Sequence, residues 1–206
     1  MGIGAVSART FVEPERTPAT RADLRGAIER AWTKETGKRP TASLLDTLTA
    51  HASLETASGA KMYNFNFGGI KGAGPHGEVA RCRTKEVVNG REIEIRDGFR
   101  SYRSIDEGAV DYVKTMRAQF GSALAKAEAG DVNGFAHALK EKHYYTANED
   151  AYASALRNLS GVHEAPAAEK PKPRILSELP DTAQIERVMD ALSRHHMTIE
   201  PAEDDD

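Results

Sequence analysis

The dipeptide Asn89-Gly90 constrains the fold of this chain more than any other feature. It separates two runs, residues 78–88 and 91–99, in which polar and apolar side chains largely alternate. Asn-Gly favours a two-residue type I′ turn because both of its residues tolerate positive φ. The sequence therefore predicts a β-hairpin whose register places Glu86 opposite Ile93.

Helical patterns precede and follow this hairpin. Thr20 forms a capping pair with Asp23, so a first helix is predicted to begin there and to end near Gly37. Thr41 opens a second helix, whose predicted end is Gly59. Further helices are expected after Ser104, after Asp131 and around Tyr152, Leu156 and Leu159. The Gly- and Asn-rich residues 62–77, which precede the hairpin, are predicted to form a loop.

Composition divides the chain into four parts. Residues 1–19 are expected to be a flexible arm, and residues 20–160 hold the hairpin and the helices described above. Residues 161–181 are rich in Pro and charge, as linkers are. Residues 182–206 combine an amphipathic helix with an acidic end, and the apolar stripe of that helix falls within residues 185–192.

Composition also excludes several classes of protein. No run approaches the roughly eighteen apolar residues of a membrane span, and no secretory signal is visible. A net charge of −3 and the lack of a strong basic stripe argue against nucleic acid as partner. Cys82 is the only cysteine, which excludes a disulfide framework and a thiolate-rich zinc site. His51 and Glu55 lack the second histidine of an HExxH motif, so neither a metal nor a cofactor is expected.

Glu55 breaks the pattern of its own helix. On a helical wheel it returns to within about 20° of Leu44, inside the apolar stripe that also holds Leu48 and Ala52. A carboxylate aimed at a core is costly unless it is paired, neutralised or used. Apolar neighbours and the negative end of the helix dipole both favour the protonated form, which a general acid requires.

Glu86 is a second carboxylate in an unexpected place. Alternation along the hairpin puts it on the same face as Ile93 and Ile95, whereas the charged side chains occupy the other face. Glycoside hydrolysis needs two such groups, one protonated and one ionised. The competing interpretation is structural: Glu55 would hydrogen-bond to His51, and Glu86 would pair with an arginine.

Residues 50–72 read AHASLETASGAKMYNFNFGGIKG, which contains Leu54-Glu55-Thr56, then asparagines, then Gly69-Ile70-Lys71-Gly72. This stretch resembles the signature of the bacterial glucosaminidase family of peptidoglycan hydrolases, glycoside hydrolase family seventy-three, which includes the domain that accompanies the flagellar rod. The resemblance continues through Thr84-Lys85-Glu86, Asn89-Gly90, residues 99–104, Glu107, Asp111-Tyr112, Tyr144-Tyr145-Thr146 and Tyr152.

The resemblance implies an α+β, lysozyme-like catalytic domain over residues 20–160, with a mainly helical lobe, a small β-hairpin lobe and a groove between them. The C-terminal helix would be an extension of this fold. It also implies Glu55 as general acid, Glu86 as second carboxylate and Tyr144 as an active-site tyrosine. Ser58 and Gly68 stand where the family often has aromatic residues, which bears on groove shape.

A further set of residues is expected to contact the sugar, because aromatic faces stack on sugar rings and amides bond hydroxyls: Tyr63, Asn64, Asn66, Gly69, Lys71 and Tyr145. For Phe65 and Phe67 in the same loop, packing into the core is an equally good interpretation.

The resemblance implies a secreted, bacteriolytic endo-β-N-acetylglucosaminidase that cleaves peptidoglycan between N-acetylglucosamine and N-acetylmuramic acid. The alternatives are a lytic transglycosylase or muramidase, and a non-catalytic peptidoglycan-binding scaffold. The expected place of action is the periplasm, the cell wall or the outside of the cell. Without a visible signal, export would need a specialised apparatus or a partner. The C-terminal helix could dock a secretion, flagellar or phage-tail partner, or it could fold back on the core.

Overall fold

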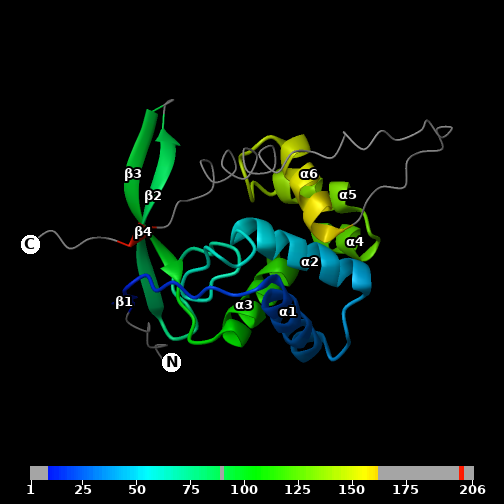
Figure 1. Ribbon diagram of the computed structural model, residues 1–206, viewed down its shortest axis with the longest axis horizontal. Helices are drawn as coiled ribbons and strands as arrows, with labels where there is room; N and C mark the ends of the chain where they lie inside the picture. Colours follow the sequence, from blue (N-terminus) through cyan, green and yellow to red (C-terminus); the bar gives the residue numbers. More distant parts are fainter. Residues whose placement is uncertain (1–8, 89–90, 162–199, 202–206) are drawn as a thin grey trace, which may run out of the picture.

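The computed structural model describes residues 9–88, 91–161 and 200–201; for residues 83–88, 91–95 and 200–201 only the backbone is described. Figure 1 shows a helical body beside a long twisted β-hairpin. The elements in chain order are β1 (Thr10–Val12), α1 (Arg21–Thr36), α2 (Ala42–Glu55), β2 (Glu78–Val88), β3 (Arg91–Arg100), α3 (Ile105–Gln119), α4 (Gly121–Glu128), α5 (Val132–Glu141), α6 (Glu149–Ser160) and β4 (Glu200–Pro201). This arrangement confirms the expected α+β class, with a mainly helical lobe and a small β lobe.

Helix α1 begins and ends as its sequence predicts. The Thr20 side chain accepts a hydrogen bond from the Asp23 amide, and the Asp23 carboxylate accepts from the Thr20 amide. These reciprocal bonds satisfy two amides that the helix itself leaves unpaired. At the other end Gly37 adopts a left-handed conformation, φ 72°, and its amide donates to the Thr33 carbonyl.

We expect Thr20→Ala to lower the free energy of unfolding by about 1 kcal/mol, because the Asp23 amide loses its partner at the start of α1. Urea unfolding followed by circular dichroism measures this change. Thr20→Ser keeps the hydroxyl and serves as control. If the alanine and serine variants unfolded at the same urea concentration, the cap would contribute nothing.

Helix α2 is the central element of the body. Thr41 caps its start, and the helix contacts α1, α4 and α6, so its residues are buried on nearly every side from Leu44 to Ser53. A helix that is surrounded in this way is stabilised by packing on all of its faces, unlike a surface helix, which packs on one face only.

The predicted end of α2 at Gly59 is wrong: the helix ends four residues earlier, at Glu55. Ala57, Ser58 and Gly59 all have positive φ, and a right-handed helix cannot continue through such residues. Thr56 stabilises the turn, since its hydroxyl donates to the Ala52 carbonyl and accepts from the Gly59 amide. Glu55 therefore becomes the last helical residue.

The hairpin has the predicted register. Val88 lies opposite Arg91, Glu86 opposite Ile93 and Thr84 opposite Ile95. β2 pairs with β3 on one side, and on its other side with β1 in parallel and β4 in antiparallel orientation. The expected N-terminal arm thus contains a strand, β1, that local sequence patterns do not indicate.

Each lobe has its own apolar cluster. The larger one fills the helical body around Leu24, Leu48, Phe67, Tyr112 and Phe135, all at most 1% exposed. The smaller one lies under the sheet and consists of Ala80, Cys82 and Phe99. Burial raises the pKa of the Cys82 thiol to about 12, as expected of a small side chain packed in a core.

The linker and the amphipathic helix expected within residues 161–199 lie outside the described residues, apart from Gly161. Among the helices that the structure describes, none is both long and apolar enough to cross a bilayer.

Candidate active site

Glu55 lies at the C-terminal end of α2 with its side chain only 2% exposed. The hydroxyl of Tyr152, on α6, donates a hydrogen bond of 3.0 Å to its Oε1 atom. His51, one turn earlier on α2, places Nε2 3.7 Å from the same oxygen. The carboxylate that the sequence pattern singled out therefore lies inside the helical body, against an aromatic wall.

The wall around Glu55 comes from three elements besides α2. Tyr112 belongs to α3, Tyr144 follows α5, and Tyr152 belongs to α6. Rings of Tyr112 and Tyr144 lie 5.8 and 4.9 Å from the His51 ring. Because α2 contacts α6 directly, the Tyr152 hydroxyl and the Glu55 carboxylate meet although 97 residues separate them.

His51 is fully buried and takes part in a short chain of polar contacts. Its Nδ1 atom lies 2.7 Å from the Tyr112 hydroxyl, which in turn lies 3.4 Å from the Leu48 carbonyl. The 3.7 Å from Nε2 to Glu55 exceeds hydrogen-bond distance, so the direct His51–Glu55 hydrogen bond of the structural interpretation is not formed. The imidazole instead lies beside the carboxylate, one turn earlier on the same helix.

The tyrosines of the wall stay protonated. Burial, and after it the negative charge of Glu55, raises the pKa of Tyr112, Tyr144 and Tyr152 well above the usual value. They therefore act as hydroxyl donors and not as bases at any physiological pH. Of these neutral hydroxyls, that of Tyr152 donates to Glu55, a contact suited to stabilising the charge of the carboxylate once a proton has left.

Two effects on the ionisation of Glu55 oppose each other. Burial disfavours the carboxylate, whereas the hydrogen bond from Tyr152 favours it. Both effects come from protein groups that surround the side chain.

We expect Tyr152→Phe to move the alkaline limb of the pH–activity profile upward by about one pH unit, because the variant loses a donor that stabilises the ionised form. The measurement is the rate of glycan cleavage between pH 4 and 9. Tyr102→Phe is the matched control, since its hydroxyl donates to Asp111 instead. An unchanged profile for Tyr152→Phe would show that this bond does not control the acid.

Tyr144 connects Glu55 with the loop that follows α2. Its hydroxyl donates to the Gly68 carbonyl at 3.3 Å, and its ring contacts Phe120 edge-on. Gly68 leaves room for this contact, because a Cβ there would lie 3.0 Å from the Tyr144 hydroxyl. The departure from the family pattern at Gly68 therefore has a local steric role.

Asn64 and Asn66, expected to contact the sugar, both bond backbone groups of the protein. The Asn64 side chain accepts from the Glu15 amide and donates to the Glu13 carbonyl. The Asn66 amide donates to two carbonyls, those of Ile70 and Arg100, and its oxygen accepts from the Ile70 amide. Both side chains therefore shape the loop through these backbone contacts.

The other residues expected to contact the sugar lie in different surroundings: two in the loop after α2, one near the sheet and one in the core. Arg16 lies over the ring of Tyr63, and Lys71 pairs with Asp97 near the sheet. Gly69 has positive φ, 57°, in the turn between them. Tyr145 is buried, stacks on Tyr152 at 3.8 Å and donates its hydroxyl to the Ala136 carbonyl.

Phe67 is fully buried and stacks on Tyr112, which decides in favour of the core interpretation for that ring. Phe65 is half-buried against the same cluster. Glu86 is described only through its backbone, which pairs with Ile93 as predicted; the position of its carboxylate lies outside the described atoms.

The sequence alone assigns no role at the site to Tyr112 or Tyr152, although the first contacts His51 and the second contacts Glu55. A usable signal was present: a tyrosine in an apolar stripe needs a partner for its hydroxyl. Among the side chains that the structure describes, no group of three His, Cys, Asp or Glu is arranged to hold a metal ion.

Comparison with known families adds to this geometry. The glucosaminidase family model, described as mannosyl-glycoprotein endo-beta-N-acetylglucosaminidase, matches residues 35–163, a span that includes both Glu55 and Tyr152. A search of curated proteins finds no match.

Solved structures give further similarities. The catalytic domain of the autolysin Auto from Listeria monocytogenes is 22% identical with a TM-score of 0.53, over 70% of this chain and 85% of that one, which shows a shared fold. A peptidoglycan hydrolase mutant from Sphingomonas sp. A1 is 27% identical with a TM-score of 0.49, over 68% and 92%. A C-terminally truncated glycoside hydrolase domain of FlgJ from Salmonella typhimurium is 24% identical with a TM-score of 0.47, also over 68% and 92%.

Proposed function

Because the chain belongs to the glucosaminidase family of glycoside hydrolases, we propose that it cleaves the β-1,4 bond between N-acetylglucosamine and the following N-acetylmuramic acid in peptidoglycan. The observation that supports Glu55 as its general acid is the location of that side chain: 2% exposed, at a helix end, with a tyrosine hydroxyl 3.0 Å from Oε1. Family membership supports glycoside hydrolysis as the reaction, and the buried carboxyl of Glu55 is suited to donating the proton that this reaction needs.

In the proposed reaction Glu55 gives its proton to the glycosidic oxygen as the bond to the anomeric carbon breaks. The Tyr152 hydroxyl already donates to the oxygen that becomes charged, so the new carboxylate is stabilised without rearrangement. Glu86 or the acetamide of the substrate stabilises the oxocarbenium-like state, and water completes the hydrolysis. Tyr144 fixes the neighbouring loop through its bond to Gly68.

The residues proposed to line the sugar are those named from the sequence: Tyr63, Asn64, Asn66, Gly69, Lys71 and Tyr145. For the two asparagines and Tyr145 the contacts described above support an indirect role, through the shape of the loop and the aromatic wall.

Product analysis on purified sacculi tests the proposal. Hydrolysis at the proposed bond yields fragments that carry one added water and end in a reducible N-acetylglucosamine. A transglycosylase would give anhydro products without that water, and a muramidase would leave N-acetylmuramic acid at the reducing end. A scaffold protein would bind sacculi and release no reducing ends. Mass spectrometry after borohydride reduction separates these outcomes, and only the first agrees with the proposal.

The substrate places the action of the enzyme at the cell wall. We propose that residues 182–206 dock a partner that delivers the protein there, on the basis of the apolar stripe in residues 185–192. Deleting residues 165–206 is expected to preserve hydrolysis of isolated sacculi and to abolish export. Unchanged export would remove the docking role.

A further inference from the structure

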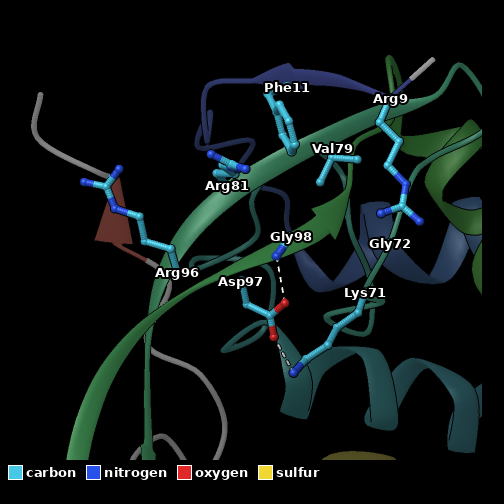
Figure 2. A pocket seen from close by; sticks show the side chains of 9 residues that line it. All are labelled: Arg9, Phe11, Lys71, Gly72, Val79, Arg81, Arg96, Asp97 and Gly98. Atoms are coloured by element: carbon cyan, nitrogen blue, oxygen red, sulfur yellow. Dashed lines mark hydrogen bonds and ion pairs between the residues drawn. The ribbon is translucent and has the colours of Figure 1, made fainter.

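A cavity of about 500 Å³ lies on the sheet, apart from the residues that surround Glu55 (Figure 2). Four segments contribute to it: the residues around β1, the loop before β2, and strands β2 and β3. Figure 2 shows cationic side chains from each of them around the cavity, namely Arg9, Lys71, Arg81 and Arg96.

The hairpin register explains why the cavity is open and charged. Arg81 on β2 lies opposite Gly98 on β3, and two residues away along each strand Val79 lies opposite Arg100. A Cβ at Gly98 would lie 2.7 Å from the Val79 side chain. Glycine at this position therefore leaves the surface of the sheet without a side chain beside Val79. Side chains alternate between faces along each strand, and the opposite face carries the apolar cluster under the sheet.

The charges around the cavity do not balance. Asp97 is its one acidic lining residue, and Asp97 is paired with Lys71. The guanidinium group of Arg81 lies 3.8 Å from the centre of the Phe11 ring. Among the interactions found within the described residues, none involves the guanidinium groups of Arg9 or Arg96. Guanidinium groups bind carboxylates in a planar, two-pronged geometry, which suits an anionic ligand.

The loop that contacts Tyr144 also forms one wall of the cavity. Tyr144 bonds the Gly68 carbonyl, and three residues later Lys71 lines the cavity. Successive Cα atoms are 3.8 Å apart, so the Cα atoms of Gly68 and Lys71 are separated by at most about 11 Å. The Asn66 side chain fixes this connection, because it bonds both Ile70 and Arg100.

We propose that this cavity binds the carboxylates of the peptide that is attached to the glycan strand next to the cleaved bond. The inference rests on the proposed function, since it assumes a glycan that carries acidic peptides. The volume supports a peptide over a single ion, because one water in the liquid occupies only about 30 Å³. The aromatic ring of Phe11, 54% exposed, would cover the peptide backbone while the arginines bind its charges.

Binding of a labelled peptide tests the site without any need for catalysis. The probe is L-Ala-γ-D-Glu-L-Lys-D-Ala with an uncharged coumarin on the lysine amine, and its counterpart has both peptide carboxylates amidated. We expect Arg9→Gln/Arg96→Gln to weaken binding of the acidic probe about tenfold. Each lost exposed charge contact is expected to raise Kd about two- to fivefold, and the double variant loses two of them. The amidated probe should bind wild type and the double variant equally weakly.

Lys38→Gln/Arg39→Gln is the matched control, because it removes two exposed positive charges between α1 and α2. It should bind both probes as wild type does. Equal affinity of wild type for the two probes, or an undiminished affinity of the cavity variant for the acidic one, would overturn the inference. Binding of inorganic polyphosphate in place of the peptide would also overturn it and would assign the cavity to a phosphate polymer.

Sacculus digestion by the same preparations separates this inference from the proposed function. The cavity variant is expected to lose the preference of wild type for peptide-bearing glycan over glycan stripped of peptide, so that the ratio of the two rates approaches one. Peptide binding without any glycan hydrolysis would reject the proposed function and leave the cavity assignment standing. Hydrolysis with no effect of the cavity variant on that ratio would reject the cavity assignment alone.

Discussion

Glu55→Gln is expected to reduce kcat for sacculus hydrolysis by about 10²–10⁴-fold, because the amide cannot supply the proton that the leaving oxygen needs. The side chain keeps nearly the same shape, and glutamine can still accept the hydrogen bond from Tyr152. Reducing-end release from sacculi measures the rate, and binding of the inactive protein to sacculi shows whether substrate recognition survives.

Glu141→Gln provides the same chemical change at an exposed position on α5 and should leave kcat within twofold of wild type. Thermal unfolding of both variants excludes loss of folded protein as the cause. If Glu55→Gln kept more than a tenth of wild-type kcat, Glu55 would not be the general acid, and another group would have to supply the proton.

Gly108→Ala is expected to lower the free energy of unfolding by about 1–3 kcal/mol, the usual cost of inserting a group into a packed region. Gly108 lies in the first turns of α3, where a Cβ would come 2.0 Å from the Phe65 carbonyl oxygen. That atom is backbone, so the loop itself must move. Differential scanning calorimetry should show a Tm lower by about 3–10 °C.

The same substitution should lower kcat/KM, since the displaced loop holds Asn66 and the Gly68 carbonyl that Tyr144 binds. Gly121→Ala is the control, because a Cβ there meets nothing within 4 Å at the start of α4. That variant should match wild type or unfold at a slightly higher temperature. If Gly108→Ala also left Tm unchanged or raised it, helix propensity would outweigh the close approach of α3 to the loop, and the prediction would be wrong.

The parts of the fold that sequence predicts are those fixed by local chemistry. Asn89-Gly90 determines the hairpin register, and Thr20 and Gly37 mark the ends of α1. The end of α2 was misplaced because nothing local announces positive φ at Ala57 and Ser58, neither of which is a glycine. β1 was not foreseen because three residues carry too little pattern, and its pairing with β2 is a long-range event.

The candidate site shows the same division. Glu55 stands out locally, because a carboxylate interrupts an apolar stripe. Its surroundings depend on packing between elements far apart in the chain, since the contact with Tyr152 spans 97 residues. The cavity likewise needs β1 beside β2 before Arg9 and Arg81 can lie near one another.

The segment that precedes α1 is joined closely to the loop behind Glu55. The backbone amides of Thr17 and Ala19 donate to the carbonyls of Met62 and Gly59. The side-chain amide of Asn64 donates to the Glu13 carbonyl. A recombinant fragment trimmed to residues 35–163, the span of the family match, would lack residues 13–19 and nearly all of α1. Expression of the working enzyme therefore calls for a fragment that starts before residue 9, well upstream of the boundary that homology alone would choose.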